Sequence, residues 1–403
     1  MEPLENQNME YSQKVVVEKL PSSQDSDDSE NSSNFRRVRF RNTFPESEKE
    51  VKRGVVGLSN LGNTCYMNSV LQAIRHIPEW IQLNTRGTLK EHENKEKPEC
   101  VEVLDAFADL QKSLWAGSSP SYVYPKGFYK TLEMVVRGTM YEQFVQRTPQ
   151  DAHEFLVWLL DQCYMASQYT VDFSIFPVAE KYPIVREAVE FWKHSFEKQY
   201  SPLTDLFFGL YRIRMECQRC HTSFTRWETF NSMKVTPLPS GTLYDAIQAE
   251  LKDELIESYD CEHCKADAKN RPNAVKKIRI WKLPKVLILT LKRFDYMGNR
   301  LNHVVGLENS NTYHFTNYFD DESHEKSKEM PYHITSTIDH YGHSMGGHYS
   351  AQCFSPIYKQ WYKYDDETVY KLDLPYVGPQ NYLFVLRQGT YESQISAKNE
   401  KSD

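Results

Sequence analysis

The sequence predicts an α+β fold, because helical patterns dominate its first half and strand patterns its second. Apolar residues recur at helical spacing over residues 101–115 and again over 150–163. Residues 286–291 (VLILTL) form a continuous apolar run, which is typical of a buried strand. Three strand-like segments follow it, at residues 332–338, 348–353 and 381–386. With 403 residues, of which 40% are hydrophobic, the chain can bury a sizeable core.

The two ends of the chain are polar. Residues 1–53 are predicted to be a disordered leader, since the run SSQDSDDSENSS is acidic, serine-rich and almost without apolar side chains. Residues 389–403 are predicted to be a flexible tail. The start lacks the basic and apolar regions of a signal peptide, and no apolar run could span a bilayer. We therefore expect a protein of the cytoplasm, the nucleus or both, without membrane partners, whose eight cysteines are free, catalytic or metal-bound.

Cys65 stands where the Gly- and Asn-rich segment GLSNLGNT ends and a helical pattern begins. Met67, Val70, Leu71 and Ile74 fall at helical spacing, and Thr64 is a candidate N-cap. Unpaired N–H groups and the helix dipole at such a start favour a thiolate, which is the nucleophilic form of cysteine. A buried cysteine in an ordinary helix is the alternative.

Strand and helical patterns surround two pairs of cysteines further along the chain. Residues 207–237 indicate β-hairpins, and residues 243–256 a helix. Two C-x-x-C pairs stand about forty residues apart, Cys217 with Cys220 and Cys261 with Cys264. Two such turns can complete a tetrahedral four-thiolate zinc site, and a closed site of this kind is structural. His221 and His263 are adjacent, but we expect both to be surface residues.

His348 follows two glycines at the start of a predicted strand, where an imidazole would be fixed yet open to a substrate. We rank it above His333, His340 and His343, which lie on the incoming strand or in the glycine loop. His153, on the 150–163 helix, is expected to pack or cap. If the strand after His348 pairs with the one beginning at Trp361, Asp365 can hold the imidazole, with Asp366 as the competing residue.

In this order the segments resemble the ubiquitin-specific protease family of cysteine deubiquitinases. The resemblance covers roughly residues 54–388. GLSNLGNTCYMNSVLQ resembles the family's cysteine box, and YHITSTIDHYGHSMGGHYSAQC with WYKYDDETV its histidine box. PQDAHEFLVWLLD, LILTLKRF and NYLFVL resemble its other recurring blocks.

The resemblance implies a papain-like hand spanning residues 54–388. The thumb would be helical, about 54–165. The fingers would be zinc-clipped β-hairpins, about 205–237 and 258–282, with a β-rich palm as the remainder. It also implies hydrolysis of the isopeptide bond after the C-terminal glycine of ubiquitin, so that ubiquitin and ubiquitinated proteins are the partners. An activating protein partner is left open.

Matched position by position, the resemblance makes Cys65 the nucleophile, His348 the general base and Asp365 the residue that orients it. Asn60 matches the oxyanion-hole side chain, and Asp366 a position that can support the site. The substrate-binding residues that it implies are Gln150, Asp151, Gly346, Gly347 and Tyr349. One position departs from the family pattern: Pro149 stands where many members have glutamine, which affects binding of the ubiquitin tail rather than the chemistry.

Three other functions are compatible with parts of the sequence. A ubiquitin-binding pseudoenzyme would use the fold without turnover, although every catalytic position is filled. A protease for a ubiquitin-like modifier would share the site. A zinc-ribbon nucleic-acid module would explain the cysteine pairs alone, but the net charge of −7 argues against nucleic-acid binding.

Overall fold

The computed structural model describes residues 53–117, 120–173, 182–267, 269–308, 311–328, 330–344 and 346–389. The predicted leader and tail, apart from Arg53 and Gly389, lie outside these residues. Within the described part of the chain, no helix is both long enough and apolar enough to cross a membrane.

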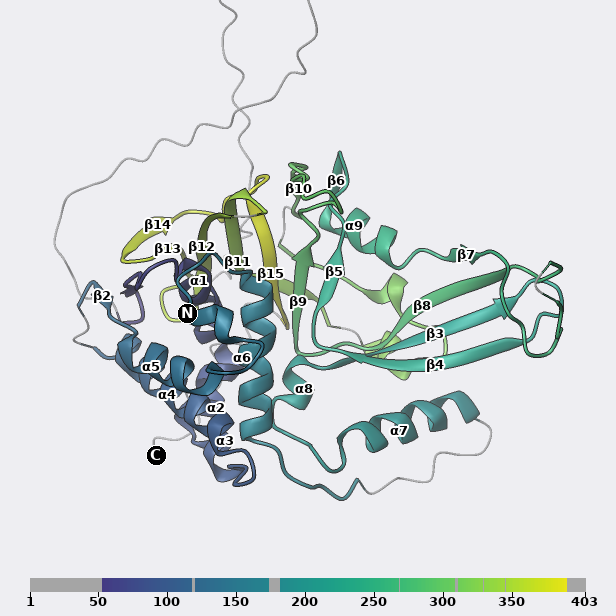
Figure 1. Cartoon of the computed structure of the whole chain (residues 1–403), viewed down its shortest axis with the longest axis horizontal. Coiled ribbons are helices and arrows are strands. Elements are labelled where there is room, and N and C mark those ends of the chain that lie inside the picture. The colour runs from purple at the N-terminus through teal and green to yellow at the C-terminus, as the bar shows by residue number, and fades with distance from the viewer. Residues whose placement is uncertain are drawn as a thin grey trace, which may run out of the picture.

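Helices form one side of the molecule, on the left in Figure 1. They are α1 (Cys65–Arg75), α2 (Pro78–Thr85), α3 (Thr88–Glu91), α4 (Pro98–Leu114), α5 (Lys126–Val136) and α6 (Ala152–Ala166), with the 3-10 turn η1 (Glu142–Val145). All residues of α1 are buried, since α6, α2 and strands of the central sheet pack against it. A short parallel pair, β1 (Gly57–Leu58) with β2 (Tyr122–Val123), lies beside these helices.

A seven-stranded sheet forms the centre, in the order β14-β13-β12-β11-β15-β9-β5. The strands are β5 (Met233–Val235), β9 (Val286–Leu291), β11 (Tyr332–His343), β12 (Gly346–Ser355), β13 (Gln360–Asp365), β14 (Thr368–Leu372) and β15 (Asn381–Gln388). All neighbours are antiparallel except β5 and β9.

The apolar run 286–291 is buried on both faces of this sheet. Val286 and Ile288 belong to the core shared with α1, α4 and α6, whereas Leu287 and Leu289 belong to the core on the opposite face. This alternation explains why β9 lacks the polar residues of a half-exposed strand.

A second, four-stranded sheet projects away from the central sheet, to the right in Figure 1. Its order is β4-β3-β8-β7, with β3 (Gly209–Cys217), β4 (Ser223–Phe230), β7 (Glu254–Ile256) and β8 (Ala274–Lys282). The remaining elements are α7 (Pro183–Phe196), α8 (Thr204–Phe207), α9 (Leu243–Glu250), β6 (Gly241–Thr242), β10 (Val305–Gly306), η2 (Thr316–Tyr318) and η3 (His324–Lys328). α7 runs along the projecting sheet, and Ile184 and Val185 pack in a cluster with Trp227 and Trp281.

Two predicted elements need correction. The helix expected over 243–256 ends at Glu250, because residues 254–256 instead pair with β8 as a strand. The helix expected from Gln150 starts at Ala152, since Asp151 is its N-cap and accepts a hydrogen bond from the Glu154 N–H.

Candidate active site

Cys65 is the first residue of α1, as predicted, and its side chain is largely buried. Thr64 occupies the N-cap position but does not cap the helix, which corrects the expectation. Its hydroxyl accepts a hydrogen bond from the Leu61 N–H at 2.9 Å and lies 3.3 Å from Asn60 Oδ1. The thiol therefore stands at a helix start that no side chain caps, in the positive end of the helix dipole.

His348 and Asp365 meet because β12 and β13 are adjacent strands. Ala351 lies opposite Tyr364, so His348 and Asp365 are diagonal neighbours on one face of the sheet. The Nε2–H of His348 donates to Oδ1 of Asp365 at 2.5 Å. The ring nitrogen that remains for Cys65 is Nδ1.

These contacts set the charges of the site. Hydrogen bonds to Asp365 and to Cys65 raise the pKa of His348 to about 10. The same bond from His348 lowers the pKa of Asp365. At neutral pH His348 is therefore an imidazolium that lies between the carboxylate of Asp365 and the sulfur of Cys65.

Lys363 also contacts Asp365, which sequence reasoning missed. Its Nζ lies 3.1 Å from Oδ2 of Asp365, on the carboxylate oxygen that His348 leaves free. The period of two along β13 places residues 363 and 365 on the same face of the strand, so the spacing alone could have indicated this neighbour.

Asn60 and Asp366 are brought together next to the cysteine. Asn60 Nδ2 donates to Oδ2 of Asp366 at 2.8 Å, which leaves its second amide hydrogen for another acceptor. Asn68, a second residue missed from the sequence, donates to Oδ1 of Asp366 at 2.8 Å. Burial raises the pKa of Asp366, so the two adjacent acids shift in opposite directions.

The candidate substrate-binding residues come from the start of α6 and the β11–β12 hairpin. Gln150 Nε2 donates to the Thr148 hydroxyl at 2.8 Å. Asp151 accepts the Tyr382 hydroxyl on Oδ2 at 2.5 Å while it caps α6. Tyr349 is buried, and its ring centroid lies 5.9 Å from that of Tyr382.

Of the two hairpin glycines, Gly347 has no room for a side chain, whereas Gly346 does. A Cβ on Gly347 would lie 2.3 Å from the Tyr341 carbonyl oxygen, and one on Gly346 would lie 3.8 Å from Pro149 Cγ. The hairpin and the start of α6 thus border each other. β12 starts at Gly346, two residues earlier than expected.

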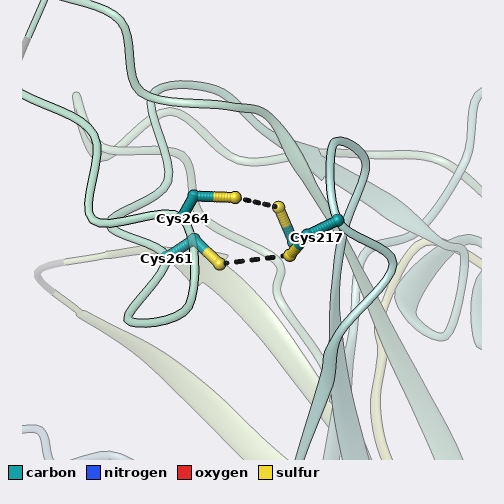
Figure 2. Close-up of side chains that lie close together, drawn as sticks. Cys217, Cys261 and Cys264 are labelled. Carbon is teal, nitrogen blue, oxygen red and sulfur yellow. Dashed lines mark hydrogen bonds between the residues drawn. The ribbon is translucent and has the colours of Figure 1, made fainter.

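The four paired cysteines converge at the tip of the projecting sheet (Figure 2). Cys217 Sγ lies 3.8 Å from Cys264 Sγ, and Cys220 Sγ lies 3.7 Å from Cys261 Sγ. A sulfur tetrahedron around zinc with bonds of about 2.3 Å has edges of about 3.8 Å, so the donors fit a zinc ion. His221 and His263 are exposed, as expected.

The family model described as "Ubiquitin carboxyl-terminal hydrolase" matches residues 56–388. Among curated proteins, ubiquitin carboxyl-terminal hydrolase 2 of Bos taurus is 27% identical over 79% of this chain, and the match spans 52% of the relative, about half its length. The enzyme of the same name from Gallus gallus is 28% identical over 81% of this chain and 90% of its own. Ubiquitin carboxyl-terminal hydrolase 4 of Candida glabrata is 31% identical, covering 78% of this chain and 38% of its own.

Among solved structures, the chain resembles one in the Ubp8/Sgf11/Sus1/Sgf73 module of SAGA bound to ubiquitin aldehyde. The TM-score is 0.64 at 22% identity, covering 86% of this chain and 72% of that one. The same module described without ubiquitin gives a TM-score of 0.60 at 22% identity, covering 84% of this chain and 68% of that one. These likenesses confirm the predicted α+β, papain-like hand.

Proposed function

Because the chain belongs to the ubiquitin carboxyl-terminal hydrolase family, we propose that it is a thiol-dependent deubiquitinase. It would hydrolyse the isopeptide bond after the C-terminal glycine of ubiquitin. The observation that carries the proposal is the convergence of Cys65, His348 and Asp365 from α1, β12 and β13.

The reaction follows from the charges of these three residues. Cys65 Sγ attacks the carbonyl carbon, and as the carbon–nitrogen bond breaks, the His348 imidazolium donates its proton to the leaving lysine amine. His348, now neutral, takes a proton from water as the water oxygen attacks the thioester carbonyl carbon. The carbon–sulfur bond then breaks, which frees the sulfur of Cys65, and the ubiquitin acid gives its proton to solvent and leaves as a carboxylate. Asp365 holds the ring by Nε2 throughout, so that Nδ1 faces the reacting atoms.

Asn60 would stabilise the oxyanion that forms during both attacks. Its amide is oriented by Asp366, and its second hydrogen is available to the developing charge. In other enzymes the loss of one such donor lowers the rate by on the order of 10²–10³. Asp366 would act through Asn60 rather than on the substrate.

The ubiquitin tail would pass between the β11–β12 hairpin and the start of α6. Gly347 lets the hairpin backbones lie close together and Gly346 lies beside Pro149, while Gln150, Asp151 and Tyr349 would line the approach. At Pro149 a side-chain hydrogen-bond donor is absent, so the neighbouring residues would carry the tail contacts.

We further propose a structural zinc ion held by Cys217, Cys220, Cys261 and Cys264. The sulfur spacing supports it, and the ion would join the turn after β3 to the turn before β8. All eight cysteines are free of disulfides, which suits the reducing cytoplasm or nucleus proposed for the protein. Ubiquitinated proteins are the proposed partners, and an activating protein remains part of the hypothesis.

The test compares wild type with Cys65→Ala on a fluorogenic ubiquitin substrate. Turnover by wild type that is lost in the variant would support the proposal. A covalent ubiquitin probe, followed by mass spectrometry, should label Cys65. Ubiquitin binding without turnover or labelling would favour the pseudoenzyme, and turnover confined to ubiquitin-like substrates would favour the modifier-specific protease.

A further inference from the structure

The turn between β13 and β14 is docked onto the segment that precedes Cys65. Asp366, at the turn, has a positive φ of 48°. Its carbonyl oxygen accepts the Leu58 N–H at 2.9 Å. A Cβ on Gly57 would lie 2.5 Å from the carbonyl oxygen of Glu367, so the two backbones pack without space between them. The β13–β14 turn and the cysteine box (residues 57–72) therefore pack closely as one unit, although they are far apart in the chain.

The side chain of Glu367 contacts the segment before Cys65, and the proposed reaction gives these contacts no role. Its Oε1 accepts two hydrogen bonds, from the Ser59 hydroxyl at 2.7 Å and from the Asn60 backbone N–H at 2.8 Å. Ser59 is buried. A single carboxylate oxygen therefore clamps two consecutive residues of the cysteine box.

The clamp completes the restraint of Asn60. The side-chain Oδ1 of Asn60 accepts the Gly62 N–H at 2.9 Å and the Thr64 N–H at 3.2 Å, and its Nδ2 donates to Asp366. Those bonds set the direction of the amide but not the position of the backbone that carries it. The bond from the Asn60 N–H to Glu367 fixes that backbone.

We propose that Glu367 is a positioning residue for the oxyanion donor Asn60. The inference rests on the proposed function, since it assigns Glu367 to the same reaction. Consecutive residues of one turn then serve two parts of the site. Asp365 holds the imidazole, while Asp366 holds the amide of Asn60 and Glu367 its backbone. Glu367 does not contact the substrate in this role, so its loss should lower kcat and leave KM unchanged.

Three variants separate the clamp from its alternatives. Glu367→Ala removes the acceptor of both bonds. Glu367→Gln keeps an acceptor oxygen of the same reach and should recover most of the rate. Ser59→Ala removes one donor and leaves the bond to Asn60, so its loss should be smaller, and it should add nothing in the Glu367→Ala background. Asp373→Ala, on the same hairpin just beyond β14, removes a carboxylate that does not contact the cysteine box.

The readouts are kcat and KM on a fluorogenic ubiquitin substrate and the rate at which iodoacetamide alkylates Cys65. Alkylation needs the thiolate but no oxyanion hole. Because a small misplacement of a catalytic group costs up to about a hundredfold, we expect kcat of Glu367→Ala to fall by about ten- to a hundredfold. The KM and the alkylation rate of Glu367→Ala should stay close to those of wild type. For the control Asp373→Ala, kcat should stay close to wild type as well.

The outcomes are distinct. A Glu367→Ala enzyme that is as active as wild type would overturn the positioning role alone, as would a parallel loss of alkylation, which would mean a general distortion of α1. If Glu367→Ala failed to fold, a kcat of Ser59→Ala below that of Asp373→Ala, with alkylation unchanged, would support the role, and an equal kcat would reject it. Wild type without turnover on ubiquitin would reject the proposed function, and the role of Glu367 with it.

Discussion

At the scale of single residues, His348 differs in charge from the other histidines that were considered for the site. Burial lowers the pKa of His340 to about 4, and the nearby Arg300 acts in the same direction. Burial also lowers the pKa of His153 to about 4 and that of His333 below its usual value. At neutral pH these rings are uncharged. His348, with a pKa of about 10, keeps a proton that it can give to a leaving amine.

The charge of Asp365 should be visible in the pH dependence of the reaction. In Asp365→Asn the amide can still accept a hydrogen bond, but the negative charge that helps to raise the pKa of His348 is lost. The pKa of His348 should fall, so the imidazolium should be lost at a lower pH, and the alkaline limb of kcat/KM should move to lower pH. We expect the rate at neutral pH to fall by about tenfold, because Cys-His-Asn enzymes work with an amide here.

A pH–rate profile on a fluorogenic ubiquitin substrate measures this shift. Asp373→Asn, which changes the charge of the same hairpin away from His348, is the control and should leave the limb in place. An alkaline limb that does not move in Asp365→Asn would mean that a group other than His348 limits the rate at high pH.

At the scale of secondary-structure elements, the parts that could be predicted are those set by local spacing. The helix at Cys65 and the buried strand β9 follow from runs of apolar residues. The pairing of β12 with β13 was the condition on which the role of Asp365 was predicted, and the structure meets it, which brings Asp365 to His348. Strand β7 was wrongly predicted as the end of a helix, because its pairing with β8 outweighs the local helical pattern.

Contacts between elements that are far apart in the chain could not be predicted from the sequence pattern. Glu367 and Ser59 are 308 positions apart, and acidic residues beside a turn ordinarily indicate no more than solvent exposure. Nothing in the local pattern says which backbone N–H such a carboxylate will meet. The resemblance to a family supplied Asn60 and Asp366, whereas Glu367 required coordinates.

Zinc should hold the tip of the projecting sheet together. The purified protein should contain about one zinc per chain, and Cys261→Ser should lose it, because three thiolates leave the tetrahedral shell open. The turns that carry the cysteines should then exchange amide hydrogens faster, while α1 should be unaffected. Metal analysis and hydrogen exchange measure the two effects.

His263→Ala is the matched control for the zinc site. His263 lies beside Cys264 but is exposed, so its loss should leave the zinc content unchanged. Loss of zinc in His263→Ala would instead indicate a mixed cysteine–histidine site. Retention of zinc in Cys261→Ser would contradict the four-thiolate assignment.

At the scale of the whole molecule, the helices and the central sheet share one core. Residues of α1, α4 and α6 belong to the same buried cluster as Ile338 of β11 and Leu383 of β15. Cys65, the proposed nucleophile, therefore lies on the helical side and His348 on the sheet, and the two sides are packed around one core. We expect the two parts to unfold together.

One ion pair ties the two parts at their boundary. Arg387 of β15 donates from Nε to both carboxylate oxygens of Glu79 in α2, at 2.7 and 2.9 Å, and its Nη2 lies 2.6 Å from Oε1. The side chains are 14% and 25% exposed, so water screens the pair less than a surface pair. Its loss should therefore cost more than the loss of an exposed pair.

Arg387→Met should lower the free energy of unfolding by about 1–3 kcal/mol, because it leaves a half-buried carboxylate without its partner. Urea unfolding measures the change, and a double-mutant cycle with Glu79→Gln isolates the coupling between the two side chains. Lys112→Met is the control. Lys112 and Asp109 form a pair that is 71% and 74% exposed, whose loss should cost less than about 1 kcal/mol. If the two variants were equally stable, the ion pair between α2 and β15 would contribute no more than a surface contact, and the shared apolar core would account for the stability of this boundary.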